Sequence, residues 1–124
     1  MTPAEFRIKR RTLGLTYQDV AAACNVTERT AQRWEATHEP PVDACMWLED
    51  KWTTAASAVD QAMQLAEEME PEPVTLIAYR RDKDAQARQG MTAREHSALL
   101  GHITMLLTLG DFDYQVVDLS LIHI

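Results

Sequence analysis

The chain has 124 residues, of which 46% are hydrophobic and 25% charged, which is typical of one compact domain or of one small domain with an appended segment. No apolar run approaches the roughly 20 residues of a membrane-spanning helix, and the charged start MTPAEFRIKRRTLG lacks an apolar signal core. We therefore exclude a membrane-spanning class and expect a cytoplasmic protein. The cysteines Cys24 and Cys45 lie in apolar helical settings and are expected to be buried thiols.

The net charge of −7 is unevenly distributed along the chain. Residues 1–37 hold six basic and four acidic residues, whereas residues 38–124 hold six basic and fifteen acidic residues. A basic end on an acidic remainder suits a protein that presents one face to phosphates. The charge distribution alone is equally compatible with an acidic, solvated protein that has no role with nucleic acid.

Three helices are predicted in the first third of the chain, at about 3–13, 16–24 and 27–35. Thr16 and Asp19 have the spacing of a capping box, in which each residue's side chain bonds the other's backbone at the start of a helix. These signals predict two short helices with a sharp turn between them after one longer helix.

The second and third helices have the residue pattern of a helix-turn-helix. Ala21 supplies the small residue where the helices cross, Asn25 accepts a positive φ in the turn, and Val26 is the apolar anchor. Ala31 and Trp34 mark the buried side of the third helix. Its other side carries polar residues, namely Glu28, Arg29, Gln32 and Arg33.

The run LTYQDVAAACNVTERTAQRWE, which covers residues 15–35 or about a sixth of the chain, resembles the XRE (lambda-repressor-like) helix-turn-helix family. The residues that match the usual family run are Leu15, Thr16, Ala21, Val26, Arg33, Trp34 and Glu35. Tyr17 stands where the family often has a phosphate-contacting Gln, and Asn25 replaces the usual Gly. The resemblance implies a protein that binds operator DNA as a dimer.

By the logic of that family, the third helix enters the major groove with its N-terminal end first. The residues then expected to contact base edges are Thr27, Glu28, Arg29 and Gln32. The residues expected to contact phosphates are Tyr17, Gln18, Thr30, Arg33, Arg10 and Arg11. Glu28 is equally explained as a helix-start acid that favours the helix dipole, Arg29 has the alternative of an ordinary surface arginine, and Trp34 at this spacing is typical of a core residue.

A long helical segment is predicted over about 42–69, followed by a boundary at the EPEP run of residues 70–73. Its apolar stripe recurs at spacings of three and four, through Cys45, Leu48, Trp52, Ala55, Val59, Met63 and Ala66. The segment is either one long helix that packs a neighbour or a partner chain, or two shorter helices with a bend near Thr53–Thr54. The boundary separates a DNA-binding domain at 1–70 from a dimerisation domain at 73–124.

Strand and helix signals alternate after the boundary. A strand is predicted at 74–79, a short exposed helix over 81–89, a longer helix over 92–109, and a final strand at 113–124. The fold class expected is therefore mainly α, a helix-turn-helix bundle with a small α+β (strand–helix–strand) dimerisation part. A two-stranded sheet is rarely stable alone, and pairing with a second copy would stabilise it.

This order of elements is similar to that of the YdiL-like regulators and of the anti-CRISPR-associated autorepressors of phages and mobile elements. The resemblance implies a homodimer whose C-terminal part dimerises. We therefore expect a transcriptional regulator, a homodimeric (auto)repressor that binds an inverted-repeat operator in double-stranded DNA. The alternative is an antitoxin or adaptor that binds a partner protein through its C-terminal part and autoregulates through the helix-turn-helix.

The sequence gives little support to an enzyme. The histidines are scattered, at His38, His96, His102 and His123, without the spacing of a metal site. Neither a CxxC pair nor a Gly-rich phosphate loop occurs. We therefore expect no catalytic residue, no metal and no cofactor.

Overall fold

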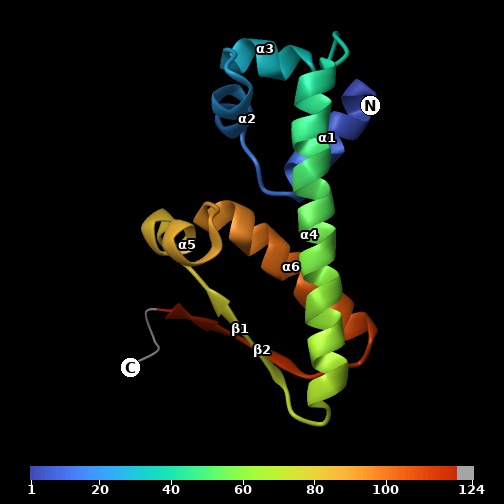
Figure 1. The fold of residues 1–124 in the computed structure, drawn as a ribbon, viewed down its shortest axis with the longest axis vertical. Helices are drawn as coiled ribbons and strands as arrows, with labels where there is room; N and C mark the ends of the chain where they lie inside the picture. Colours follow the sequence, from blue (N-terminus) through green and yellow to red (C-terminus); the bar gives the residue numbers. More distant parts are fainter. Residues whose placement is uncertain (120–124) are drawn as a thin grey trace. The chain divides into compact units, whose positions relative to one another are not determined.

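The computed structural model describes residues 1–119, and the chain divides into two compact units, Met1–Thr54 and Ala55–Ile124 (Figure 1). The elements are α1 (Pro3–Thr12), α2 (Tyr17–Cys24), α3 (Glu28–Arg33), α4 (Val42–Met69), β1 (Val74–Ala78), α5 (Asp82–Gln89), α6 (Ala93–Leu109) and β2 (Tyr114–Asp118). The protein is mainly helical, as expected. The division between the units falls inside α4 and not at residues 70–73, where the sequence predicts a boundary.

The helices of the first unit begin where their capping residues predict. Thr16 accepts a hydrogen bond from the backbone N–H of Asp19 at 3.1 Å, and the Asp19 carboxylate accepts one from the N–H of Thr16 at 2.8 Å. This reciprocal pair is the predicted capping box, and it satisfies two backbone donors at the start of α2. Thr2 and Glu5 form a second capping box at the start of α1.

The core of the first unit gathers apolar side chains from all four of its helices. Phe6 of α1, Val20 of α2, Ala31 of α3 and Leu48 of α4 are all fully buried. The Phe6 ring meets the ring of Trp34 edge to face, with centroids 6.1 Å apart. This geometry is favourable for two aromatic rings and fixes the end of α3 against α1.

The long segment forms one continuous helix of 28 residues, so the two shorter helices considered from the sequence are not found. Its first turns contribute Ala44 and Leu48 to the core of the first unit. Its later turns contribute Ala66, with Val59 and Met63 packed around it, to the core of the second. Among residues 1–119, no helix combines the length and the apolar character that crossing a membrane requires.

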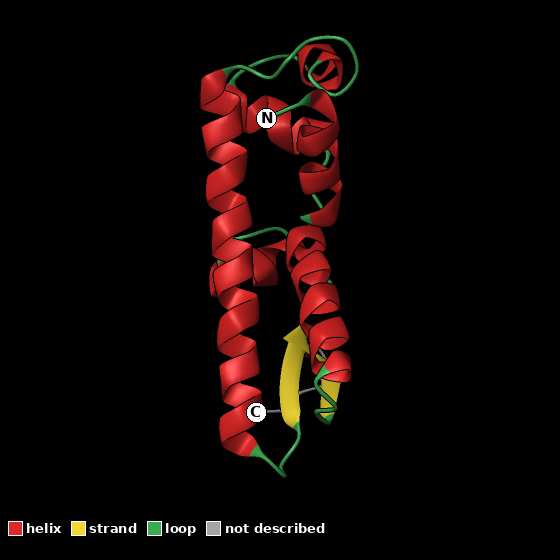
Figure 2. Ribbon diagram, turned by 90° about the vertical axis from the view of Figure 1, so that its right-hand side faces the viewer, coloured by secondary structure: helices red, strands yellow, loops and turns green. Residues whose placement is uncertain are grey.

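The second unit is built on the expected two-stranded sheet, seen beside α6 in Figure 2. The strands β1 and β2 are parallel, with a register that runs from Val74 opposite Tyr114 to Ala78 opposite Asp118. Parallel neighbours need a long crossover connection, and the chain supplies it with α5 and α6. Of the final strand predicted at 113–124, residues 120–124 lie outside the described residues.

Side chains from α4, β1 and α6 form the core of the second unit. It consists of Ala66, Val74, Leu100, Ile103 and Leu107. The three residues of α6 follow the predicted spacing of three and four, which places them on one side of that helix.

Candidate nucleic-acid interface

A tight turn joins α2 to α3. Asn25 ends α2 in the left-handed conformation, with φ 56° and ψ 48°, as the sequence predicted for a turn residue at this position. The N–H of Val26 donates to the carbonyl oxygen of Ala21 at 3.0 Å. Ala21 on α2 and Ala31 on α3 are both buried. Small residues at these positions let two short helices pack closely behind the turn.

Helix α3 has one buried and one exposed side. Ala31 and Trp34 are buried, as predicted. Thr27 caps the helix by accepting a hydrogen bond from the backbone N–H of Thr30 at 3.1 Å. The exposed residues at the start of α3 and on its other side are Thr27, Glu28, Arg29, Gln32 and Arg33. The structure thus places the four residues predicted to contact bases at the start and on the exposed side of one short helix.

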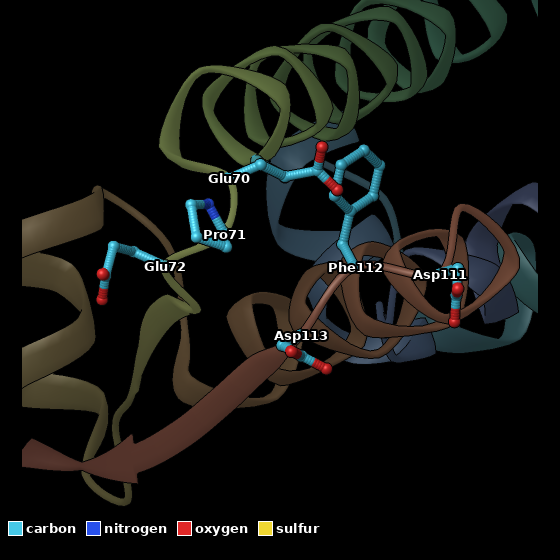
Figure 3. A pocket seen from close by; sticks show the side chains of 7 residues that line it. Glu70, Pro71, Glu72, Asp111, Phe112 and Asp113 are labelled. Atoms are coloured by element: carbon cyan, nitrogen blue, oxygen red, sulfur yellow. The ribbon is translucent and has the colours of Figure 1, made fainter.

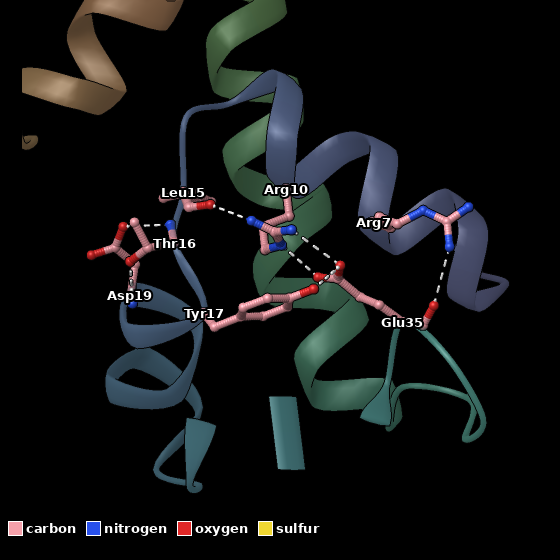
Figure 4. Close-up of polar contacts among 7 residues, drawn as sticks. All are labelled: Arg7, Arg10, Leu15, Thr16, Tyr17, Asp19 and Glu35. Carbon is pink, nitrogen blue, oxygen red and sulfur yellow. Dashed lines mark hydrogen bonds and ion pairs between the residues drawn. The ribbon is translucent and has the colours of Figure 1, made fainter. Parts of the chain in front are cut away.

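Arg10 does not lie where its predicted phosphate contact requires. Arg10 is 7% exposed and its guanidinium is held inside the unit, where Nε donates to Oε2 of Glu35 at 2.5 Å and Nη2 to Oε1 at 3.2 Å. Its Nη1 donates to the carbonyl oxygen of Leu15 at 2.8 Å (Figure 4). Because these donors are engaged in the interior, Arg10 is a residue of the core and we withdraw it from the predicted phosphate contacts.

Glu35 accepts hydrogen bonds from Arg7, Arg10 and Tyr17 of the first unit, a role that the sequence did not predict. It is 4% exposed, and the Tyr17 hydroxyl donates to its carboxylate at 3.1 Å. Nη1 of Arg7 donates to its backbone carbonyl oxygen at 3.3 Å. The ion pair therefore connects α1, the start of α2 and the residues after α3 (Figure 4). The sequence feature that could have indicated this role is the position of Glu35 directly after Trp34, which was predicted to be buried.

The remaining predicted phosphate contacts differ in exposure. Tyr17 is half-buried, with its hydroxyl directed at Glu35 and its ring 4.2 Å from the Arg10 guanidinium carbon. Thr30 is half-buried and its hydroxyl lies 3.0 Å from that of Thr27. The side chains that remain exposed are Arg11, Gln18 and Arg33.

The second unit contains an acidic hollow. It has a volume of about 260 Å³ and is lined by Ala66, Glu70, Pro71, Glu72, Asp111, Phe112 and Asp113 (Figure 3). Four of the residues that line it carry carboxylates, and this negative charge would repel a phosphate. Within residues 1–119, however, no group of three or more His, Cys, Asp or Glu residues is arranged to hold a metal ion. We therefore place no DNA contact at this hollow.

Burial shifts the pKa of two side chains. It raises the pKa of the Cys24 thiol, and both Cys24 and Cys45 are half-buried free thiols, somewhat more exposed than expected. It lowers the pKa of His96, whose ring lies edge to face against Tyr79 with centroids 4.9 Å apart. Nδ1 of His96 is buried and has no hydrogen-bond partner among the described residues.

Neither the known family models nor the curated proteins contain a significant match to this chain.

Proposed function

We propose that this protein is a sequence-specific DNA-binding transcriptional regulator, a homodimer that uses α3 as its recognition helix. The observation that carries the proposal is the exposed polar side of α3, with Arg29 and Gln32 at its centre, on a helix whose other side is buried. Arginine suits guanine and glutamine suits adenine at base edges in the major groove. The αL turn at Asn25 and the buried Ala21 and Ala31 support a helix-turn-helix assignment.

The electrostatics of the first unit support the same function. Arg10 and Glu35 compensate each other in the interior, so the basic excess of residues 1–37 falls on side chains nearer the surface. Arg11, Arg29 and Arg33 are all exposed. Exposed cations in a chain of net charge −7 favour binding of DNA by this unit, because the acidic remainder repels phosphates.

The homodimer is supported by an apolar patch on the second unit, made of Met105, Leu109, Tyr114 and Val116, all of them exposed. Met105 and Leu109 lie one turn apart on α6, and Tyr114 and Val116 lie two residues apart on β2. The Tyr114 hydroxyl is 3.5 Å from that of Thr108, which places this side of β2 next to α6. A second copy that covers this patch would remove apolar surface from water and extend the small sheet.

Selection of bound duplexes from a random pool tests the DNA-binding function. We expect an inverted repeat whose half-sites lie about 34 Å apart, the spacing of successive major grooves on one face of DNA. Arg29→Ala and Gln32→Ala should each weaken binding to the selected site by about 1–3 kcal/mol and relax the base preference at one position. Arg88→Ala, which removes an exposed arginine from α5, is the matched control. Failure to select any duplex would refute the function.

Light scattering tests the dimer. We expect a dimer at micromolar concentration and a monomer after Leu109→Glu, since a charge at the centre of an apolar interface is costly to bury. Asp60→Glu, an exposed change on α4, should leave the dimer intact. A wild-type monomer would contradict the proposal.

The same patch favours an alternative function, an antitoxin or adaptor that binds a partner protein. A dimer that forms by another surface and leaves Met105 and Leu109 exposed would support this alternative, because large exposed patches mark interaction sites. Solvent-accessible labelling of Met105 in the dimer distinguishes the two: protection relative to the Leu109→Glu variant supports self-association, and reactivity equal to that of the variant supports a different partner.

A further inference from the structure

A hollow lies beside the C-terminal half of α3, where the chain leaves that helix toward α4. Its volume is about 300 Å³, and its walls are Thr30, Arg33, Trp34, His38, Glu39 and Pro41. Arg33 and Thr30 were predicted from the sequence to contact phosphates, whereas His38 and Glu39 had no predicted role. The hollow therefore joins residues of α3 to residues of the following connection in one concave surface.

The side chains around this hollow divide into donors and an apolar wall. Arg33 and His38 are exposed, and Thr30 adds a hydroxyl group. Nδ1 of His38 lies 2.7 Å from the Thr37 hydroxyl oxygen. When that hydroxyl donates to Nδ1, the neutral imidazole carries its proton on Nε2 and offers it as a donor. Trp34 and Pro41 supply the apolar wall.

We propose that this hollow binds one sugar–phosphate unit of the DNA backbone, an inference that rests on the proposed function. The phosphate oxygens accept hydrogen bonds from Arg33, His38 and Thr30, and the deoxyribose packs against Trp34 and Pro41. An apolar wall next to hydrogen-bond donors suits a sugar–phosphate better than a free phosphate, which has no apolar part. The unit carries no base, so the hollow fixes the position of α3 on the duplex without reading sequence.

Glu39 allows a test in which the expected change in DNA affinity has the opposite direction. Its exposed carboxylate lines the same hollow and opposes a phosphate there. Neutralising Glu39 should therefore strengthen binding at the position where removing Arg33 or His38 weakens it. If these residues merely supported the fold, their substitutions would all weaken DNA binding and would not change it in opposite directions.

Fluorescence anisotropy on the full chain tests the hollow, with the selected duplex and an unrelated duplex over a range of salt concentrations. Arg33→Ala should weaken binding to both duplexes about equally and reduce the salt slope by about 1, as expected for one lost phosphate contact. His38→Ala should weaken both about 3-fold or more, and Glu39→Gln should tighten both by about 2-fold or more. Glu67→Gln and Arg88→Ala, equal changes of charge in the second unit, should have smaller effects.

The outcomes separate this inference from the proposed function. If the unmodified chain selects no duplex, both fail. If it binds a selected duplex and the Arg33, His38 and Glu39 variants bind like the wild type, with circular dichroism showing them folded, only the hollow is refuted. Inorganic phosphate is the remaining probe: chemical-shift changes at His38 in the DNA-free chain would identify a free-anion site and overturn the sugar–phosphate assignment, and no change at His38 supports it.

Discussion

The two units bury polar groups in opposite ways. In the first, Arg10 and Glu35 are both buried as ions, and they satisfy each other together with Tyr17 and the carbonyl oxygen of Leu15. In the second, His96 is 5% exposed and its Nδ1 has no partner among the described residues. The first unit therefore depends on keeping two charges together. The second depends on keeping one group uncharged.

The aromatic residues make this difference measurable. All three tryptophans, Trp34, Trp47 and Trp52, lie in the first unit, and the second contains none. Tryptophan fluorescence therefore reports unfolding of the first unit, whereas far-ultraviolet circular dichroism reports the helices of both.

The largest effect is expected from breaking the ion pair. Glu35→Ala leaves the Arg10 guanidinium buried without its carboxylate, and breaking such a pair typically costs about 3–5 kcal/mol. Urea unfolding followed by tryptophan fluorescence should show this loss in the first unit. A loss below about 1 kcal/mol would mean that water reaches Arg10 freely and that the pair is not a core element.

Two further variants show whether the cost comes from burial. Glu49 accepts a hydrogen bond from Lys9 at 2.7 Å, but its side chain is about half exposed, so Glu49→Ala should cost no more than about 1 kcal/mol. The double variant Arg10→Met with Glu35→Leu should recover much of the loss, because apolar side chains can replace a buried pair. Tyr17 loses its acceptor in that variant, which makes full recovery unexpected.

The next effect is a cavity in the second unit. Leu107 is fully buried at the centre of its aliphatic core, and Leu107→Ala should cost about 2–5 kcal/mol. Circular dichroism should detect an earlier transition while tryptophan fluorescence at the wild-type midpoint changes less. Leu65→Ala, on an exposed position of α4, is the control and should cost under about 1 kcal/mol. Equal losses from both variants would refute the assigned core.

Local signals in the sequence predicted much of this fold because they act over a few residues. Thr16 and Asp19 form their capping box, Asn25 adopts a positive φ, and the strand–helix–strand order yields the parallel sheet. The continuity of α4 was left open because Thr53 and Thr54 are only mildly unfavourable in a helix, and packing outweighs such a preference.

Contacts between distant residues could not be predicted in this way. Arg10 looks like one more cation on a basic helix, and its burial depends on a carboxylate 25 positions later. The exposure of Arg29 and Gln32 on α3 follows from helical spacing and was predicted. The hollow at His38 was not, because the connection to α4 has no periodicity from which to place its side chains.

The smallest effect is the pH dependence of the second unit. Burial lowers the pKa of His96 in the folded chain, whereas an unfolded histidine titrates near pH 6.5. Below about pH 6.5 the unfolded state therefore binds the proton first, and stability falls as the pH falls toward the lowered pKa, by at most about 1.4 kcal/mol per pH unit. Above that range the ring is neutral in both states and contributes no slope.

His96→Gln removes this titration, so we compare the free energies of unfolding of wild type and variant by circular dichroism. Above about pH 6.5 the difference between them should not change with pH. Below it the wild type should lose stability relative to the variant. The other histidines are common to both proteins, so the difference isolates His96. A wild-type stability that rises on acidification relative to the variant would mean that His96 gains a partner when protonated, and the contrast with the paired Arg10 and Glu35 would be lost.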